Sequence, residues 1–120
     1  MRDNKLLGKL GEDLAASLLY SEGYDIRCRN YRTYRGEIDI VCEKNGVIYF
    51  TEVKTRTNEI YGLPEESVDE KKQRRIRDAA NCYIVSHQGT AAEKNVMFKV
   101  VEILIRETDD AFMGKAGGER

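Results

Sequence analysis

The sequence is poor in the residues on which many catalytic and structural sites depend. Its 120 residues include one histidine, three cysteines, one proline and no tryptophan. Cys28, Cys42 and Cys82 are widely spaced and form no C-x-x-C pair, so we expect small buried residues and neither a disulfide framework nor a zinc site. The one histidine, His87, lies near the end of an expected helix, where a structural role is favoured. Histidine triads and histidine-rich metal sites are therefore excluded.

Long hydrophobic runs and a strong charge of one sign are also absent. No stretch approaches the roughly 18 apolar residues of a membrane span, and no signal segment opens the chain. The net charge of −1 and the pI of about 5.9 argue against a strongly basic protein that binds nucleic acid indiscriminately. We expect a cytoplasmic protein with no membrane partner, and local patches must decide whether it binds nucleic acid.

The chain is long enough for one sheet covered by a few helices, with a single domain over residues 1–112 and a disordered tail over 113–120. Patterning predicts helices over 4–21 and 67–86, strands over 24–31 and 96–105, and a hairpin within 36–54. The breakers Asn58, Gly62 and Pro64 predict a loop from Thr55 to Glu66. This order, α-β-β-β-α-β, indicates an α/β fold with a central mixed sheet and flanking helices.

The hairpin between residues 36 and 54 is the most informative stretch. Asn45-Gly46 is typical of a type I′ turn, which sets Lys44 opposite Val47. Counting outward then places Asp39 opposite Glu52, and Glu37 opposite Lys54. Because side chains alternate along a strand, these four charged residues are expected on one face, together with Val41, Ile48 and Phe50. The opposite face is expected to be apolar, with Ile38, Ile40, Val47, Tyr49 and Val53.

Two carboxylates that face each other across a strand pair destabilise the sheet, because their Cβ atoms are only about 5 Å apart. A hydrated Mg²⁺ or Mn²⁺ ion bound by Asp39 and Glu52 would offset this repulsion. Lys54, beside such an ion, would have a lowered pKa and could act as a general base toward an attacking water. The alternative is a surface hairpin with weak cross-strand ion pairs, but the apolar faces favour a central hairpin.

The helix over residues 4–21 is expected to have two different faces. A leucine stripe on one face consists of Leu6, Leu7, Leu10, Leu14 and Leu18. The second face carries Glu12 among Gly8, Ala15 and Ala16, and it is small enough to approach a sheet or a phosphate backbone closely. Gly8 and Gly11 each cost roughly 1 kcal/mol in a helix, which indicates a packing or functional reason. The alternative for Glu12 is an ordinary solvated side chain.

Basic residues are concentrated in two places. The helix over 67–86 opens with a capping box, Ser67 and Glu70, and has Ile76, Ala79, Ala80, Tyr83 and Ile84 on its inner side. Five of the seven residues from Lys71 to Arg77 are basic. Arg74 and Arg77 predict a phosphate-binding strip there, although such runs also occur on solvated helix faces. Arg32 and Arg35, beside Tyr31 and Tyr34, could contact phosphates and unpaired bases, or could simply protect an edge strand.

Several of these segments together resemble a known family. Asp39 followed by Glu52-Val53-Lys54 is similar to the PD-(D/E)XK core of restriction endonucleases and Holliday-junction resolvases. From about residue 8 to residue 112 the chain resembles the YraN family of small bacterial endonuclease-like proteins. The segments that carry this resemblance are Arg29-Asn30-Tyr31-Arg32, Gly36-Glu37-Ile38-Asp39-Ile40, Glu52-Val53-Lys54-Thr55-Arg56, Ser67-Val68 and Lys72-Gln73.

The resemblance implies a restriction-endonuclease-like fold and a metal-dependent endonuclease that hydrolyses DNA phosphodiesters with Mg²⁺ or Mn²⁺. It also implies that Glu12 assists Asp39 and Glu52 at the metal, and that Lys72 and Gln73 lie near the substrate. Branched or structured DNA and a homodimer are carried over from the resolvases. The alternative is a binding module for nucleic acid or protein that retains the fold without catalysis.

Overall fold

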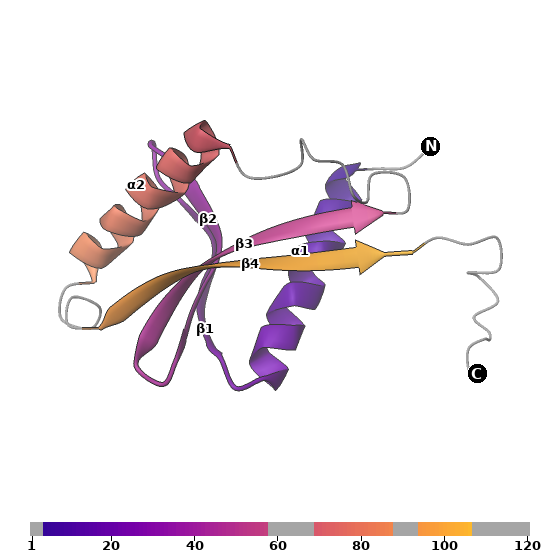
Figure 1. The fold of residues 1–120 in the computed structure, drawn as a ribbon, viewed down its shortest axis with the longest axis horizontal. Helices are drawn as coiled ribbons and strands as arrows, with labels where there is room; N and C mark the ends of the chain where they lie inside the picture. The colour runs from indigo at the N-terminus through magenta and orange to yellow at the C-terminus, as the bar shows by residue number, and fades with distance from the viewer. Residues whose placement is uncertain (1–3, 58–68, 88–93, 107–120) are drawn as a thin grey trace.

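The computed structural model describes residues 4–57, 69–87 and 94–106, which form two helices and four strands (Figure 1). The elements are α1 (Asn4–Ser21), β1 (Asp25–Arg32), β2 (Glu37–Lys44), β3 (Val47–Thr57), α2 (Glu70–Ser86) and β4 (Asn95–Ile105). The strands form one sheet in the order β1-β2-β3-β4. β1, β2 and β3 are antiparallel neighbours, and β4 is parallel to β3. The expected α/β fold with a mixed sheet is confirmed, and it is consistent with a restriction-endonuclease-like fold.

Neither helix in the described part of the chain is long and apolar enough to cross a bilayer. The tail expected over residues 113–120 lies outside the described residues.

The hairpin of β2 and β3 has the predicted turn, with positive φ angles of 53° at Asn45 and 79° at Gly46. Pairing runs from Lys44 opposite Val47 to Ile40 opposite Thr51, as predicted. The further pairs expected from counting, Asp39 opposite Glu52 and Glu37 opposite Lys54, are not formed. β3 nevertheless continues to Thr57, because β4 pairs with it along its whole length. The expectation of a loop from Thr55 was therefore wrong at its first three residues, and residues 58–66 lie outside the described ranges.

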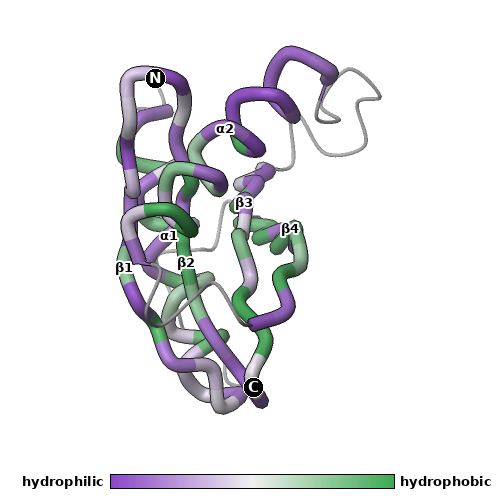
Figure 2. Tube along the Cα trace, turned by 90° about the vertical axis from the view of Figure 1, so that its left-hand side faces the viewer, coloured by the Kyte–Doolittle hydropathy of each residue, from purple (hydrophilic) through white to green (hydrophobic). Residues whose placement is uncertain are grey.

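Two hydrophobic clusters cover the two faces of the sheet. The cluster beneath α2 contains Ile38, Val41, Ile48, Phe50, Ala79, Ala80 and Tyr83. The cluster beneath α1 contains Ala15, Leu19, Ile40, Cys42 and Val101. Since Val41 alternates with Ile40 and Cys42 along β2, the two helices lie on opposite faces. The expectation that Ile38 shares a face with Ile40 was wrong, because the simple alternation of β2 breaks between Ile38 and Val41. Figure 2 shows hydrophobic residues along the inner strands and hydrophilic residues along the first turns of α2.

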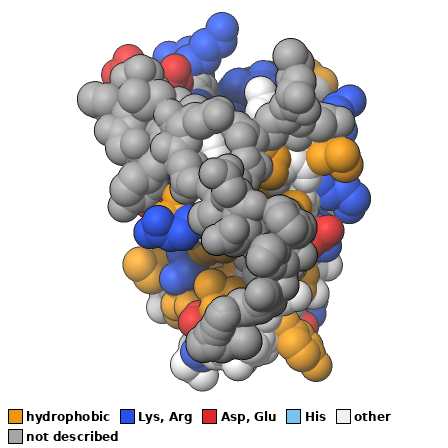
Figure 3. Space-filling model, turned by 90° about the vertical axis from the view of Figure 1, so that its right-hand side faces the viewer, with side chains coloured by type: hydrophobic (Ala, Val, Ile, Leu, Met, Phe, Trp, Pro, Cys, Tyr) orange, Lys and Arg blue, Asp and Glu red, His pale blue; other side chains and the backbone are white. Residues whose placement is uncertain are grey.

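α1 packs on the sheet through its small residues and not through its leucine stripe. Leu6, Leu10, Leu14 and Leu18 are 44% to 64% exposed, whereas Gly11, Ala15 and Leu19 are buried. A Cβ atom at Gly11 would lie 1.9 Å from the Thr55 Oγ1, so the helix meets β3 too closely for a larger side chain. A Cβ at Gly8 would meet nothing within 4 Å, so packing does not require that glycine. Figure 3 shows hydrophobic side chains at the surface of one face of the molecule, next to basic ones.

α2 begins at Glu70, later than the sequence suggested. Its N-cap is Asp69, whose side chain accepts a hydrogen bond of 2.8 Å from the Lys72 backbone N–H. This replaces the expected capping box, and Ser67 itself lies outside the described residues. At the other end His87 is the C-cap, and its ring stacks on Tyr83 at 3.9 Å between centroids. The histidine therefore has a structural position, as expected.

Candidate active site

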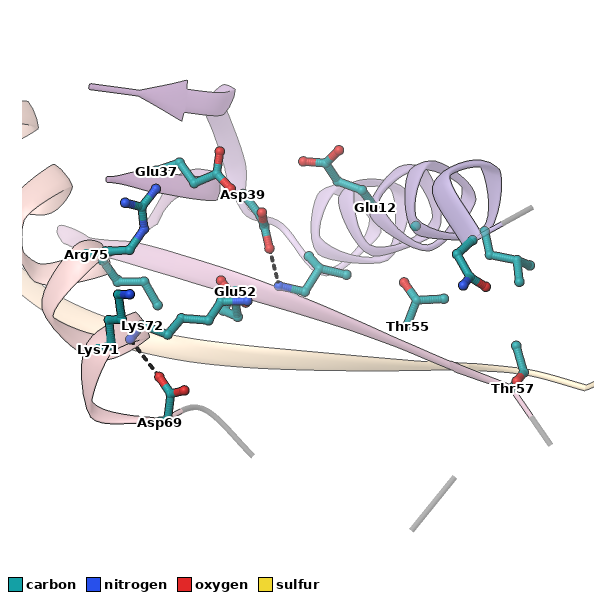
Figure 4. A pocket seen from close by; sticks show the side chains of 15 residues that line it. Glu12, Glu37, Asp39, Glu52, Thr55, Thr57, Asp69, Lys71, Lys72 and Arg75 are labelled. Carbon is teal, nitrogen blue, oxygen red and sulfur yellow. Dashed lines mark hydrogen bonds and ion pairs between the residues drawn. The ribbon is translucent and has the colours of Figure 1, made fainter. Parts of the chain in front are cut away.

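A cleft of about 930 Å³ opens where β2 separates from β3, between α1 and α2. Its polar lining comes from four elements and from the N-cap of α2 (Figure 4). The lining residues used below are Gly8, Glu12, Glu37, Asp39, Glu52, Thr55, Lys71, Lys72 and Arg75. Carboxylates from α1, β2 and β3 occupy one side and the middle, and the basic side chains of α2 face them. The end of the β2–β3 pairing thus creates the cleft.

Asp39 lies at the point where the two strands part. A Cβ at Gly36 would lie 2.0 Å from the Arg75 carbonyl oxygen, so only a glycine lets the chain enter β2 this close to α2. Asp39 then projects toward β3, where its Oδ2 accepts a hydrogen bond of 2.7 Å from the Val53 backbone N–H. This bond takes the place of a regular strand pair. It also fixes the carboxylate at the cleft.

The electrostatic surroundings of Asp39 are unfavourable to its negative charge. The pKa of Asp39 is raised to about 6, mainly by burial and also by the nearby charges of Glu52 and Glu12, whereas the Val53 N–H and Lys72 act in the opposite sense. Three carboxylates therefore interact across this cleft. A cation that binds among them would relieve the repulsion.

Glu52 is almost fully buried, at 7% exposure, and is paired with Lys72. The Lys72 Nζ lies 2.6 Å from the Glu52 Oε2. Burial opposes the charge of Lys72, but the hydrogen bond to Glu52 and the charges of Glu52 and Asp39 raise its pKa above the ordinary value. Lys72 is therefore a protonated counter-ion at neutral pH.

Glu12 reaches the cleft from α1, next to the close contact at Gly11. Its Oε1 accepts a hydrogen bond of 3.3 Å from the Asn30 side chain and lies 3.6 Å from the Arg29 guanidinium. Its Oε2 is buried and has no hydrogen-bond partner among the described groups. A buried carboxylate oxygen without a partner is costly, and a cation or a hydrogen-bond donor placed beside it would offset that cost.

Lys54 lies outside the cleft lining. Its neighbours Val53 and Thr55 line the cleft, whereas Lys54 is half-buried and stands opposite Glu102 of β4. The structure thus brings together the three acidic residues of the sequence motif, Glu12, Asp39 and Glu52. Lys72 from α2 contacts one of them, Glu52.

The residues expected to bind nucleic acid are divided among several places. Lys72 lines the cleft, and Gln73 and Arg77 line a smaller cavity beside it. Arg74 is exposed on α2. Arg32 forms an ion pair of 3.2 Å with Glu37, and Arg35 donates a hydrogen bond of 3.0 Å to the Tyr34 hydroxyl. Neither Arg32 nor Arg35 lines the cleft.

Sequence reasoning missed two basic residues of the cleft wall, Lys71 and Arg75. Both belong to the basic run, but from that run only Lys72, Arg74 and Arg77 were assigned to phosphate. Helical spacing was the available signal, because Arg75 lies three and four residues after Lys72 and Lys71 and so shares their face. The orientation of that face toward the cleft depends on the Gly36 contact, which no local pattern shows.

The donor set suits a hard divalent cation. Glu12, Asp39 and Glu52 offer only carboxylate oxygens, the ligands that Mg²⁺ and Mn²⁺ prefer. The unpartnered Glu12 oxygen and the raised pKa of Asp39 both indicate a site that lacks positive charge. Within the described ranges, no three acidic, histidine or cysteine side chains stand close enough to enclose a metal ion. An ion would therefore take further ligands from water and from a phosphate, as Mg²⁺ commonly does.

Comparison with known proteins identifies the family. The model of "Uncharacterised protein family UPF0102" matches residues 11–103, a span that contains all the carboxylates of the cleft. A UPF0102 protein of Alkaliphilus oremlandii is 42% identical over 104 residues, which is 87% of this chain and 89% of that one. A UPF0102 protein of Syntrophomonas wolfei is 43% identical over 87% of this chain and 89% of its own. A UPF0102 protein of Dictyoglomus turgidum is 41% identical over 86% of each chain. The resemblance found in the sequence is confirmed, and the chain belongs to UPF0102, the YraN family.

Proposed function

We propose that this protein is a metal-dependent DNA endonuclease that hydrolyses phosphodiester bonds in the cleft where β2 and β3 separate. The observation that carries the proposal is the meeting of Glu12, Asp39 and Glu52, from three different elements, opposite the basic start of α2. Acidic and basic side chains on facing walls suit a phosphodiester and a cation together. The family resemblance supports the same reaction class.

In this proposal Asp39 and Glu52 would hold Mg²⁺ or Mn²⁺. Glu12 would assist them through water, since no three carboxylates of the described residues enclose an ion. The bound ion would stabilise the charge that develops on the scissile phosphate. Before binding, Lys72 neutralises Glu52 through their contact of 2.6 Å. If a metal ion took its place at Glu52, the Lys72 ammonium could contact a substrate phosphate, together with Lys71 and Arg75 on the same wall.

The attacking water must lose a proton, and the lysine of the motif, Lys54, is proposed for that task. Lys54 does not line the cleft, but it follows Glu52 by two residues on β3 and therefore lies on the same side of the sheet. Lys72 is unsuited to it, because its raised pKa keeps it protonated. Branched or structured DNA is the proposed substrate, and a homodimer the proposed assembly, both by analogy with the resolvases.

Metal binding and cleavage test the proposal together. Calorimetry with Mn²⁺ should give a binding isotherm for the wild type that is lost in Asp39→Asn and Glu52→Gln. A branched DNA should be cut by the wild type and not by these two variants. Asp25→Asn is the matched control, because Asp25 is an exposed carboxylate outside the cleft, and it should behave as wild type. Absence of Mn²⁺ binding by the wild type would end the proposal, and equal cleavage by all variants would indicate a contaminating nuclease.

A binding module without catalysis is the second candidate. It is favoured by the Glu52–Lys72 contact, which already neutralises one intended metal ligand, and by the lack of a closed metal cluster in the described residues. It predicts DNA or protein binding that EDTA does not change and that survives Asp39→Asn. Metal-dependent cleavage would rule it out.

A further inference from the structure

A second cavity, of about 310 Å³, lies between α2 and β4 and adjoins the cleft. The two hollows share Glu52 and Ile76 in their linings. The other lining residues that matter are Phe50, Phe98, Gln73 and Arg77. A ligand that extends from the cleft past Glu52 therefore enters this cavity next.

The cavity presents an aromatic surface in an unusual position. Phe50 is buried, but Phe98 beside it is 55% exposed, with the two ring centroids 5.9 Å apart. Ile76 of α2 forms an apolar wall. Large exposed apolar rings that line a cavity often mark a binding site, because they gain from being covered.

The polar groups at this cavity fit a nucleotide. Arg77 and Gln73 lie one turn apart on α2 and supply a cation for phosphate and an amide for the edge of a base. Lys99 also contributes to the lining, but its ammonium lies 5.5 Å from the Tyr24 ring centroid, over another part of the sheet. Arg77 is thus the cation of the cavity, with Lys72 next to it at Glu52.

We propose that an unpaired nucleobase stacks on Phe98 in this cavity while the adjoining phosphate lies at Glu52 and Lys72. This inference rests on the proposed function and narrows its substrate to DNA with an unpaired nucleotide beside the bond to be cut. A base in an intact duplex has both faces covered by its neighbours, so it cannot use the ring. Aromatic stacking platforms of this kind accept any base, so little sequence preference is expected.

The test compares three duplexes of equal length in EDTA, where wild-type protein binds without cleavage. One duplex is fully paired, one has a single unpaired 2-aminopurine, and one has an abasic site at that position. The 2-aminopurine duplex should bind roughly 5- to 150-fold more tightly than the abasic one, the range expected for one base stacked on an aromatic ring. Its fluorescence should rise on binding, because 2-aminopurine is quenched while it stacks between neighbouring bases and leaves them when it moves onto Phe98.

Phe98→Leu keeps an apolar side chain but removes the flat ring, and it should bring the affinity for the 2-aminopurine duplex down to that for the abasic one. The fully paired duplex should bind Phe98→Leu and wild type equally. Met97→Leu is the matched control, because Met97 is similarly exposed but points to the other face of β4. Thermal melts of both variants check that the fold is kept.

Equal affinity for the 2-aminopurine and abasic duplexes, or fluorescence that does not rise on binding, would overturn the stacking proposal. If metal-dependent cleavage persists in that case, only the substrate assignment fails and the nuclease function stands. If the wild type binds none of the three duplexes, both proposals fall.

Discussion

The two helices that flank the sheet bring opposite charges to the cleft, and they are held in different ways. α1 meets β3 through Gly11 and places Glu12 by close backbone contact. α2 is anchored by Ala79, Ala80 and Tyr83, which lie toward its C-terminal end. Its basic first turns reach the cleft with long side chains, and Lys72 is 51% exposed. Steric fit therefore fixes the backbone of both walls, at Gly11 on α1 and at Gly36 against α2, but only the basic wall has long exposed side chains that can adjust to what is bound.

The largest effects are expected at two lysines, Lys54 of β3 and Lys72 of α2. Lys54→Met should lower cleavage by roughly 10² to 10⁴, the usual contribution of a positioned proton-transfer group, and leave Mn²⁺ binding nearly unchanged. Lys72→Met should instead strengthen Mn²⁺ binding, because the ammonium that competes for Glu52 is gone. Without metal this variant should be less stable than wild type, since Glu52 is left buried and uncompensated. Calorimetry, single-turnover cleavage and thermal melts measure these effects.

Lys9→Met is the control for both lysine variants, because Lys9 is exposed on α1 and lies outside the cleft lining. It should change neither metal binding nor stability. Weaker Mn²⁺ binding by Lys72→Met would show that α2 supports the metal site and does not compete with it.

The next effect concerns the charge of Asp39. With a pKa of about 6 in the folded protein against 3.8 ordinarily, Asp39 takes up a proton on folding over the range from about pH 4 to 6. Its contribution to stability is therefore most favourable below pH 4 and is lost as the pH rises through 6. Asp39→Asn, which keeps an oxygen for the Val53 N–H, should be more stable than wild type at pH 7.5, by at most about 3 kcal/mol.

Urea denaturation at several pH values without metal measures this difference, which should shrink as the pH falls to 4. If the difference in the free energy of unfolding does not depend on pH, the charge of Asp39 does not destabilise the folded protein. Adding Mn²⁺ should stabilise the wild type, because a metal that binds only the folded state favours folding. It should not stabilise the variant, which lacks the Asp39 carboxylate.

Steric fit at α1 is tested by two glycines on the same helix. Gly11→Ala should lower the free energy of unfolding by about 1 to 3 kcal/mol, because the new Cβ would lie 1.9 Å from the Thr55 side chain. Gly8→Ala is the matched control, since its Cβ would meet nothing within 4 Å, and it should raise stability by up to about 1 kcal/mol. Denaturant titration distinguishes the two. Equal effects would show that α1 is not held by this contact.

The smallest effect is expected at the outer face of α1. Leu10→Lys and Leu14→Lys should each change stability by no more than about 0.5 kcal/mol, because both side chains are about 45% exposed. Larger losses in denaturant titration would mean that this face is covered in solution. Sedimentation of the wild type and both variants would then show whether the expected homodimer covers it.

Local chemistry in the sequence was sufficient for several features of this protein. Asn45-Gly46 set the turn and the hairpin pairing as far as Ile40 and Thr51, since turn conformation and strand alternation are short-range properties. The order of helices and strands followed from periodicity, and the family from the joint motifs. Glu12, Asp39 and Glu52 were also chosen from sequence, and they line one cleft.

Contacts between distant segments decided the rest. The contact of Gly11 with Thr55 buries the small face of α1, and the contact of Gly36 with Arg75 positions α2. These contacts lie where β2 leaves β3, beyond the pair of Ile40 and Thr51. Hydrophobicity alone favoured burial of the leucine face of α1 against the sheet. The helix instead lies so close to β3 that only its small residues fit between them. The lysine beside Glu52 came from α2, because proximity in the fold and not spacing along β3 determines which cation reaches a buried carboxylate.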